Sequence, residues 1–298
     1  VFEAVLSVIE RPYSYADLMA ISSIGLTIKW FRGEYGNVWG GDSLPGDCED
    51  EIQLISQAIG YDCNVKIGDA NKIECKKLII ESINNGIPAI CLDKGINLAV
   101  IFGYENDGDI LLVRPYIDSC ADMEDWDASV RYAFNDLLPY FILLNESNIQ
   151  VDKIDAIING IKIGMNNYNR KSQISKGNYY SKGTYYYGKE AYEKWINDLT
   201  NIELYNTEEQ ASIKFFSWWN SISLMNRRTT MVTVFRNLAG NPYKTLTTKA
   251  YVETAKLCTQ QVSILEKMNK DNSYNTDCSK WIGQISNDIQ SLKLLADI

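Results

Sequence analysis

The 298-residue sequence contains no histidine. Imidazole is the usual proton shuttle of Ser-His-Asp and Cys-His sites and a frequent metal ligand, so its absence excludes those mechanisms, the HExxH zinc sites and the zinc deaminases. The glycines form neither a GxGxxG pattern nor a Walker pattern, which leaves nucleotide-binding folds without support. The missing histidine is therefore the strongest functional constraint in the sequence.

Long hydrophobic runs are also lacking, because no window of 18 consecutive residues is apolar. The opening VFEAVLSVIE has neither the basic region nor the cleavage site of a signal peptide. The seven cysteines are widely and irregularly spaced, odd in number and without a CxxC pair, which favours reduced thiols over a disulfide framework or structural zinc. These features predict a cytoplasmic protein with no membrane partner.

Charge is distributed unevenly between the two halves. Residues 1–150 carry 10 basic and 24 acidic side chains, a net charge of −14, whereas residues 151–298 carry 19 and 14, a net charge of +5. An acidic first half repels phosphate backbones, and the basic residues of the second half are scattered among acids. No nucleic-acid partner is expected.

The first half predicts helices followed by strands. Helical spacing occupies residues 1–10, 14–31, 48–59 and 72–85, with Ser14 as an N-cap of the second helix and Gly86 at the end of the fourth. Short β-rich runs follow at 87–93, 98–104, 109–114 and 140–144, and an Asp-Gly turn joins the second run to the third. This order predicts an α+β domain with a small antiparallel sheet over about residues 1–147.

The second half predicts an all-α helical domain over about residues 148–298. Its candidate helices are 151–165, 188–200, 207–238, 245–269 and 277–296. A polar, tyrosine-rich segment at about 166–189 separates the first two and is expected to be a loop that closes over a ligand, or one pinned to the protein surface or to a second subunit.

Three runs of residues carry a resemblance to a known family: GDCEDEIQLISQAIGYD (46–62), NNGIPAICLDKGINLAVIFGYENDGDILLVRPY (84–116) and GKEAYEKWINDL (188–199). They look like pieces of a bacterial family that is similar to the N-terminal domain of the butirosin-type acyltransferases and, more remotely, to the C39-like papain-fold cysteine peptidases. The resemblance spans most of residues 1–145. It implies a papain-like (cysteine-proteinase-like) fold for the first domain.

The sequence departs from the catalytic pattern of that family. The histidine of the family usually stands six residues before the Gly of Gly-Tyr, here Gly103, and that position holds Asn97. The orienting acid usually precedes a proline, and here that residue is Arg114. The nucleophile would be Cys48, at the start of a helix, or a residue preceding Val1. Two of the three roles are vacated, so the resemblance implies a catalytically silent relative.

We therefore expect a cleft at the domain junction that binds a small molecule or peptide, possibly anionic, with Arg114 as an anion clamp and Asn97 as a hydrogen-bond partner. The residues expected to line it are Cys48, Asp93, Asn97, Tyr104, Arg114, Tyr116, Tyr180 and Tyr186. Two structural alternatives stay open. Cys48 is otherwise a buried helix cap, and Arg114 otherwise forms an ion pair with Asp93 at the sheet edge.

Two other functions remain open. One is a cysteine-dependent acyl or amide transferase or hydrolase that works without imidazole, with Cys48 as its nucleophile and a correspondingly slow rate. The other is an oligomeric scaffold, for which a homodimer is the simplest form. No cofactor is expected, and no metal either, because the acids at 47–51 and at 118–127 lack the spacing of a calcium loop.

Overall fold

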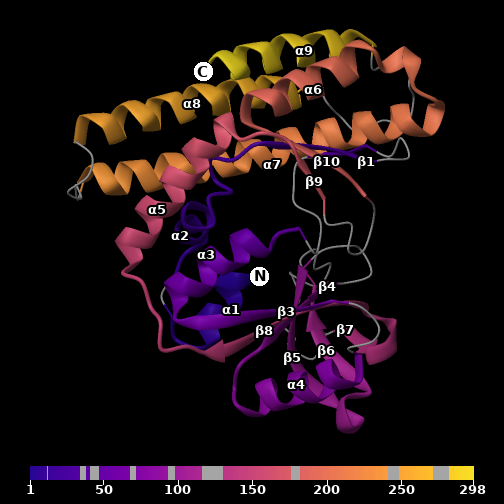
Figure 1. Cartoon of the computed structure of the whole chain (residues 1–298), viewed down its shortest axis with the longest axis vertical. Helices are drawn as coiled ribbons and strands as arrows, with labels where there is room; N and C mark the ends of the chain where they lie inside the picture. The colour runs from indigo at the N-terminus through magenta and orange to yellow at the C-terminus, as the bar shows by residue number, and fades with distance from the viewer. Residues whose placement is uncertain are drawn as a thin grey trace. The chain divides into compact units, whose positions relative to one another are not determined.

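A computed structural model describes residues 1–11, 13–33, 38–40, 47–67, 72–92, 98–115, 130–175, 182–240, 248–270 and 282–298 (Figure 1). The chain divides into two compact units. Unit 1 comprises Val1–Leu18 and Glu49–Ala156, and unit 2 comprises Met19–Cys48 and Ile157–Ile298. The sequence analysis instead placed one boundary at 147/148, and residues 19–48 therefore fall in a different unit from the one expected for them.

Unit 1 is an α+β structure, as the sequence predicts. Its helices are α1 (Phe2–Val8), the first turn of α2 (Tyr15–Ile21), α3 (Glu49–Ile59) and α4 (Lys72–Asn84). Its described strands are β3 (Tyr61–Ile67), β4 (Ala89–Leu92), β5 (Leu98–Glu105), β6 (Ile110–Arg114), β7 (Val130–Ala133) and β8 (Leu138–Glu146). They form a six-stranded antiparallel sheet in the order β3-β8-β4-β5-β6-β7.

Helix α4 packs against one face of this sheet. Cys75 and Ile79 of that helix pack with alternate residues of the strands, among them Ala99, Ile101 and Leu111, in one hydrophobic core. Alternation along a strand sends the intervening residues to the opposite face. The two faces of the sheet are thus chemically distinct.

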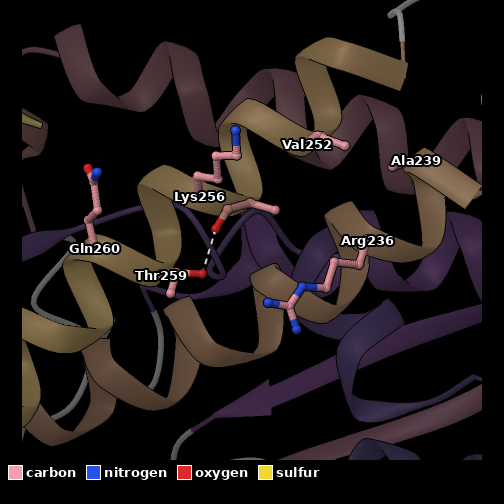
Figure 2. Close-up of a pocket in the computed structure, with 7 residues that line it drawn as sticks. Arg236, Ala239, Val252, Lys256, Thr259 and Gln260 are labelled. Atoms are coloured by element: carbon pink, nitrogen blue, oxygen red, sulfur yellow. Dashed lines mark hydrogen bonds between the residues drawn. The ribbon is translucent and has the colours of Figure 1, made fainter.

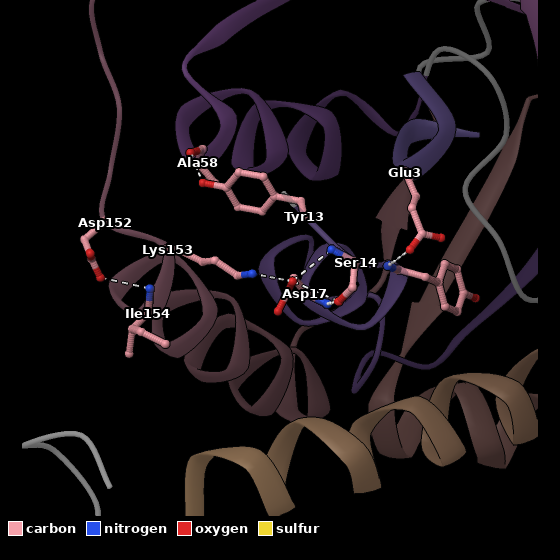
Figure 3. Close-up of polar contacts among 9 residues, drawn as sticks. Glu3, Tyr13, Ser14, Asp17, Ala58, Asp152, Lys153 and Ile154 are labelled. Atoms are coloured by element: carbon pink, nitrogen blue, oxygen red, sulfur yellow. Dashed lines mark hydrogen bonds and ion pairs between the residues drawn. The ribbon is translucent and has the colours of Figure 1, made fainter. Parts of the chain in front are cut away.

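Local signals in the sequence correctly predicted several helix ends. Ser14 and Asp17 form a reciprocal capping box at the start of α2: the Asp17 amide donates to Ser14 Oγ (3.2 Å), and the Ser14 amide donates to Asp17 Oδ2 (2.9 Å) (Figure 3). Gly86 ends α4 with a positive φ of 77°, and its amide donates to the Ile83 carbonyl. The predicted turn between β5 and β6 is a short 3-10 segment, Asn106–Gly108.

Unit 2 holds a second sheet, so the all-α prediction for residues 148–298 is wrong. The sheet has the order β2-β1-β10-β9, made from β1 (Lys29–Gly33), β2 (Val38–Gly40), β9 (Gln173–Ile174) and β10 (Gly183–Tyr187) in the described chain. The segment GTYYY, expected to belong to a loop, is strand β10 and pairs antiparallel with β1. Aromatic residues favour strands, but this segment forms a strand because it pairs with β1. That partner lies about 150 residues earlier in the chain, so no local pattern indicates the pairing.

The helices of unit 2 follow the predicted boundaries closely. They are α5 (Lys153–Asn166), α6 (Gly188–Thr200), α7 (Thr207–Gly240), α8 (Thr248–Lys270) and α9 (Ile282–Asp297). Helices α7 and α8 run antiparallel, as the contacts of Ser221 with Asn269 and of Arg228 with Gln261 show. Figure 1 shows α6 to α9 running beside one another.

The core of unit 2 joins β1 to α6. The indole rings of Trp30 and Trp195 stack at a centroid distance of 5.0 Å, and both are fully buried. Leucines and isoleucines of α7, α8 and α9 complete the cluster. Early residues of the chain therefore supply part of the core of the helical unit.

We predict that Gly160→Ala destabilises unit 2 by about 1–3 kcal/mol, because an added Cβ would overlap the carbonyl groups of Ala20 and Ile21. Gly240→Ala is the matched helical control, since no atom of the described residues lies within 4 Å of its added Cβ, and it should be neutral or slightly stabilising. Urea unfolding of both variants measures the difference. Equal stability would contradict the close approach of α5 to the end of α2.

Candidate functional site

The structure describes four of the eight predicted site residues. Tyr104 and Arg114 lie in unit 1, and Cys48 and Tyr186 lie in unit 2. The other four, Asp93, Asn97, Tyr116 and Tyr180, lie outside the described residues. The expectation of a cleft at the domain junction therefore stays a prediction, and each unit is considered by itself.

Tyr104 and Arg114 project from opposite faces of the six-stranded sheet. The register of β5 with β6 shifts between Ile101 and Gly103, so Tyr104 falls on the same face as Ile101. Its ring packs against the α4 core, and its hydroxyl donates to Asn84 Oδ1 at the end of α4 (2.9 Å). Arg114 pairs with Val100 on the other face. The structure does not bring these two predicted site residues together, and Tyr104 instead links the sheet to α4.

The face that carries Arg114 is only partly covered over β5, β6 and β7. Val100, Leu112 and Arg114 are half-buried on it, and Arg131 of β7, which pairs with Leu112, is exposed. We call these four residues the open face. It combines two apolar side chains with two guanidinium groups, which is the composition of a surface for a partly apolar anion.

The two arginines of the open face differ in their surroundings. Arg131 Nε lies 3.2 Å from Glu105 Oε1, and both side chains are substantially exposed. Such a surface pair contributes little to stability and is screened by salt. Arg114 is half-buried at the end of β6, immediately before Pro115. Of the two, Arg114 is the better placed to hold an anion away from bulk water.

Cys48 occupies the position that the sequence predicts, directly before the first residue of α3. It is half-buried and forms no disulfide bond in the described chain. The positive end of a helix dipole favours a thiolate, but the first turn of α3 carries Glu49, Asp50 and Glu51, whose charges oppose it. Cys48 is thus a helix-terminal thiol whose neighbours along the chain are acidic.

The other described thiols are poor nucleophiles. Burial raises the pKa of Cys63 to about 12, and burial also raises the pKa values of Cys75 and Cys258. Cys91 lies fully buried in the middle of β4. Among these described cysteines, Cys48 is the best candidate for reaction at neutral pH.

Tyr186 lies on β10 and not in a loop. Its ring packs against the core around Trp30, and the Lys194 ammonium lies 5.1 Å from the ring centroid. Its neighbours Tyr185 and Tyr187 are buried. These tyrosines stabilise the sheet of unit 2, which favours the structural explanation of the tyrosine-rich segment over that of a ligand-closing loop.

Sequence analysis missed a buried polar cluster around Asp198. This carboxylate is 1% exposed and accepts hydrogen bonds from Trp30 Nε1 (2.8 Å) and from the Tyr205 hydroxyl (2.7 Å). Arg32 Nη1 lies 3.7 Å from it. Burial, together with the bond to Asp198, raises the pKa of Tyr205 to about 12. No pattern of neighbouring residues indicates this cluster, because its members come from β1, α6 and the segment after α6.

Arg228 is a second buried charge that the sequence analysis did not single out. Its guanidinium is 4% exposed and donates to the Gly25 and Leu26 carbonyls and to Gln261 Oε1. Carbonyl groups after a helix end carry partial negative charge, so the guanidinium neutralises the turn that follows α2. Arg228, on α7, therefore connects residues 25 and 26 to α7 and, through Gln261, to α8 by hydrogen bonds.

Metal-binding and membrane-spanning arrangements are not found in the parts of the chain that the structure describes. There, no group of three or more cysteine, aspartate or glutamate side chains is suitably placed to hold a metal ion. None of the described helices has both the length and the apolar character needed to cross a bilayer.

Comparison with known proteins adds no relative: no family model, no curated protein and no solved structure matches the chain. Function is therefore inferred from the chemistry of the described residues.

We predict that iodoacetamide at neutral pH modifies Cys48 at least about tenfold faster than Cys63, because a thiol with a pKa of about 12 is almost wholly protonated there. Peptide mapping by mass spectrometry measures the two rates, and unfolding in guanidinium chloride should equalise them. Comparable rates in the folded protein would contradict the difference in burial.

We predict that Asp198→Asn lowers the free energy of unfolding by about 1–3 kcal/mol, since one amide oxygen cannot replace two carboxylate oxygens that accept from Trp30 and Tyr205. Denaturant unfolding followed by tryptophan fluorescence measures the loss. Asp155→Asn, at an exposed position of α5, is the control and should change stability by less than about 0.5 kcal/mol. An equal effect of both variants would argue that the buried bonds contribute nothing.

Proposed function

We propose that unit 1 is a papain-like domain without catalytic activity and that it binds a small organic anion, a carboxylate or the free carboxyl end of a peptide, on its open face. The proposal rests on Arg114, a half-buried residue beside two apolar residues, on a face of the sheet that α4 does not cover. Arginine suits this role because its planar group binds a carboxylate through two parallel hydrogen bonds.

The order of elements in unit 1 supports the papain-like assignment. Helix α3 precedes the sheet, and β4, β5 and β6 form a meander in which the segment resembling the family's histidine strand pairs with the strand ending in Arg-Pro. The register places Arg114 opposite Val100, three residues after position 97. A papain-type enzyme would use this end of the two strands for its imidazole and its orienting acid.

Binding is favoured over catalysis by the chemistry of the available groups. The absence of histidine removes the general base that a Cys-His enzyme requires. Burial raises the pKa of Cys63, on β3, and of Cys75, on α4, and so disfavours their thiolates. An arginine in place of the orienting acid attracts an anion, whereas a catalytic imidazolium needs a carboxylate there.

We predict that at least one carboxylate from a panel of organic acids and short peptides raises the melting temperature of the wild-type protein. Arg114→Gln should lower the affinity for that ligand by about tenfold or more, as expected for loss of a charge-assisted hydrogen bond. Arg114→Lys keeps the charge but not the two-point geometry and should give an intermediate affinity. Thermal-shift titration followed by calorimetry measures the constants.

The matched control is Lys77→Gln, which removes an exposed cation from α4, on the other side of the sheet from the open face. It should leave the affinity within about twofold of the wild type, because an exposed charge that does not contact the ligand is screened. Equal losses in the Arg114→Gln and Lys77→Gln variants, or no stabilising carboxylate, would refute the proposal. Circular dichroism of the ligand-free variants separates lost binding from lost folding.

A further inference from the structure

The structure contains a groove in unit 2, between α7 and α8, that is separate from the open face of unit 1. Its volume is about 640 Å³, which is within the range of small-molecule pockets. Figure 2 labels six of the residues that line it: Arg236, Ala239, Val252, Lys256, Thr259 and Gln260; Ala255 also lines it.

The floor of the groove is aliphatic. Ala239 comes from α7, and Val252 and Ala255 come from successive turns of α8. Val252 is 40% exposed although it is apolar. This floor would gain free energy by contact with an apolar chain, at about 25 cal/mol per Å² of surface removed from water.

The charge of the groove is positive. Arg236 contributes a guanidinium from α7 and Lys256 an ammonium from α8, and none of the residues that line the groove in the described chain is acidic. Within that same part of the chain, Arg236 has no hydrogen-bond or ion-pair partner, whereas Lys256 pairs with Glu253 at 3.3 Å. Arg236 is therefore the cation of the groove that is available to an anionic group.

We propose that this groove binds a monoanionic amphiphile, a small molecule with an apolar chain and a single carboxylate, sulfonate or phosphate head group. The chain lies along Ala239, Val252 and Ala255, and the head group binds the guanidinium of Arg236.

Decanoate, below its micelle concentration, is the probe, and calorimetry is the measurement. The experiment uses the full chain carrying Arg114→Gln, so that the carboxylate site proposed for unit 1 makes no contribution and failure of one proposal leaves the other intact. We expect saturable binding of decanoate and at least about tenfold weaker binding of decanol, which lacks the charge.

Variants of the groove assign the binding to named residues. Arg236→Gln should weaken the binding of decanoate by about tenfold, and Val252→Glu, at an exposed position, should abolish it by repulsion. Lys256→Gln should change the affinity by less than about threefold, because its ammonium is exposed and paired with Glu253. Lys267→Gln removes an exposed charge elsewhere on α8 and should have no effect.

The proposal would be overturned by the absence of saturable decanoate binding, by equal affinity for decanoate and decanol, by an undiminished affinity in Arg236→Gln, or by an equal loss in Lys267→Gln. Phosphatidylglycerol vesicles distinguish the source of the anion. In one outcome the protein sediments with vesicles, Arg236→Gln abolishes this sedimentation, and free decanoate does not bind. That outcome would assign the groove to a membrane head group and refute the proposal of a free amphiphile.

Discussion

The hydrogen bond from Trp30 Nε1 to Asp198 is the interaction on which unit 2 depends. It joins residues 168 positions apart, and it lies beside the stack of Trp30 on Trp195. The bond satisfies a carboxylate that is almost wholly excluded from water, and an unsatisfied carboxylate there would be costly. Through this contact β1 is fixed beside α6, and β10 finds the partner that makes it a strand.

The guanidinium of Arg228, on α7, is a second polar group that joins early residues of the chain to the helices of unit 2. It binds the carbonyls of Gly25 and Leu26, which follow α2, while Gln261 accepts its third hydrogen bond. Neutral acceptors satisfy this cation in a region where water is excluded. The segment between α2 and β1 is thereby attached to the helices of unit 2, which explains why residues 19–48 belong to that unit.

In unit 1 the decisive feature is a shift of register within one pair of strands. The irregularity between Ile101 and Gly103 turns Tyr104 toward α4 and leaves Val100, Leu112 and Arg114 on the partly covered face. Two residues that sequence analysis assigned to one cleft are thereby separated. The chemistry of the open face is consequently that of arginine beside aliphatic side chains, and it lacks the Tyr104 hydroxyl.

The sequence alone determined the local structure. The capping box of Ser14 and Asp17, the terminating Gly86, the turn at 106–108 and the bounds of α6 all depend on residues within a few positions of one another, so their signals are contiguous. It also excluded catalysis by a histidine-dependent site, because the absence of histidine is a property of the sequence itself.

Only the tertiary structure decided which residues meet. The pairing of β1 with β10, the burial of Asp198, the two faces of β5 and the groove between α7 and α8 each join residues distant in the chain or depend on one irregular pair of strands. Such contacts leave no periodic or local pattern, since the free energy that selects them comes from burial and hydrogen bonding in the folded molecule.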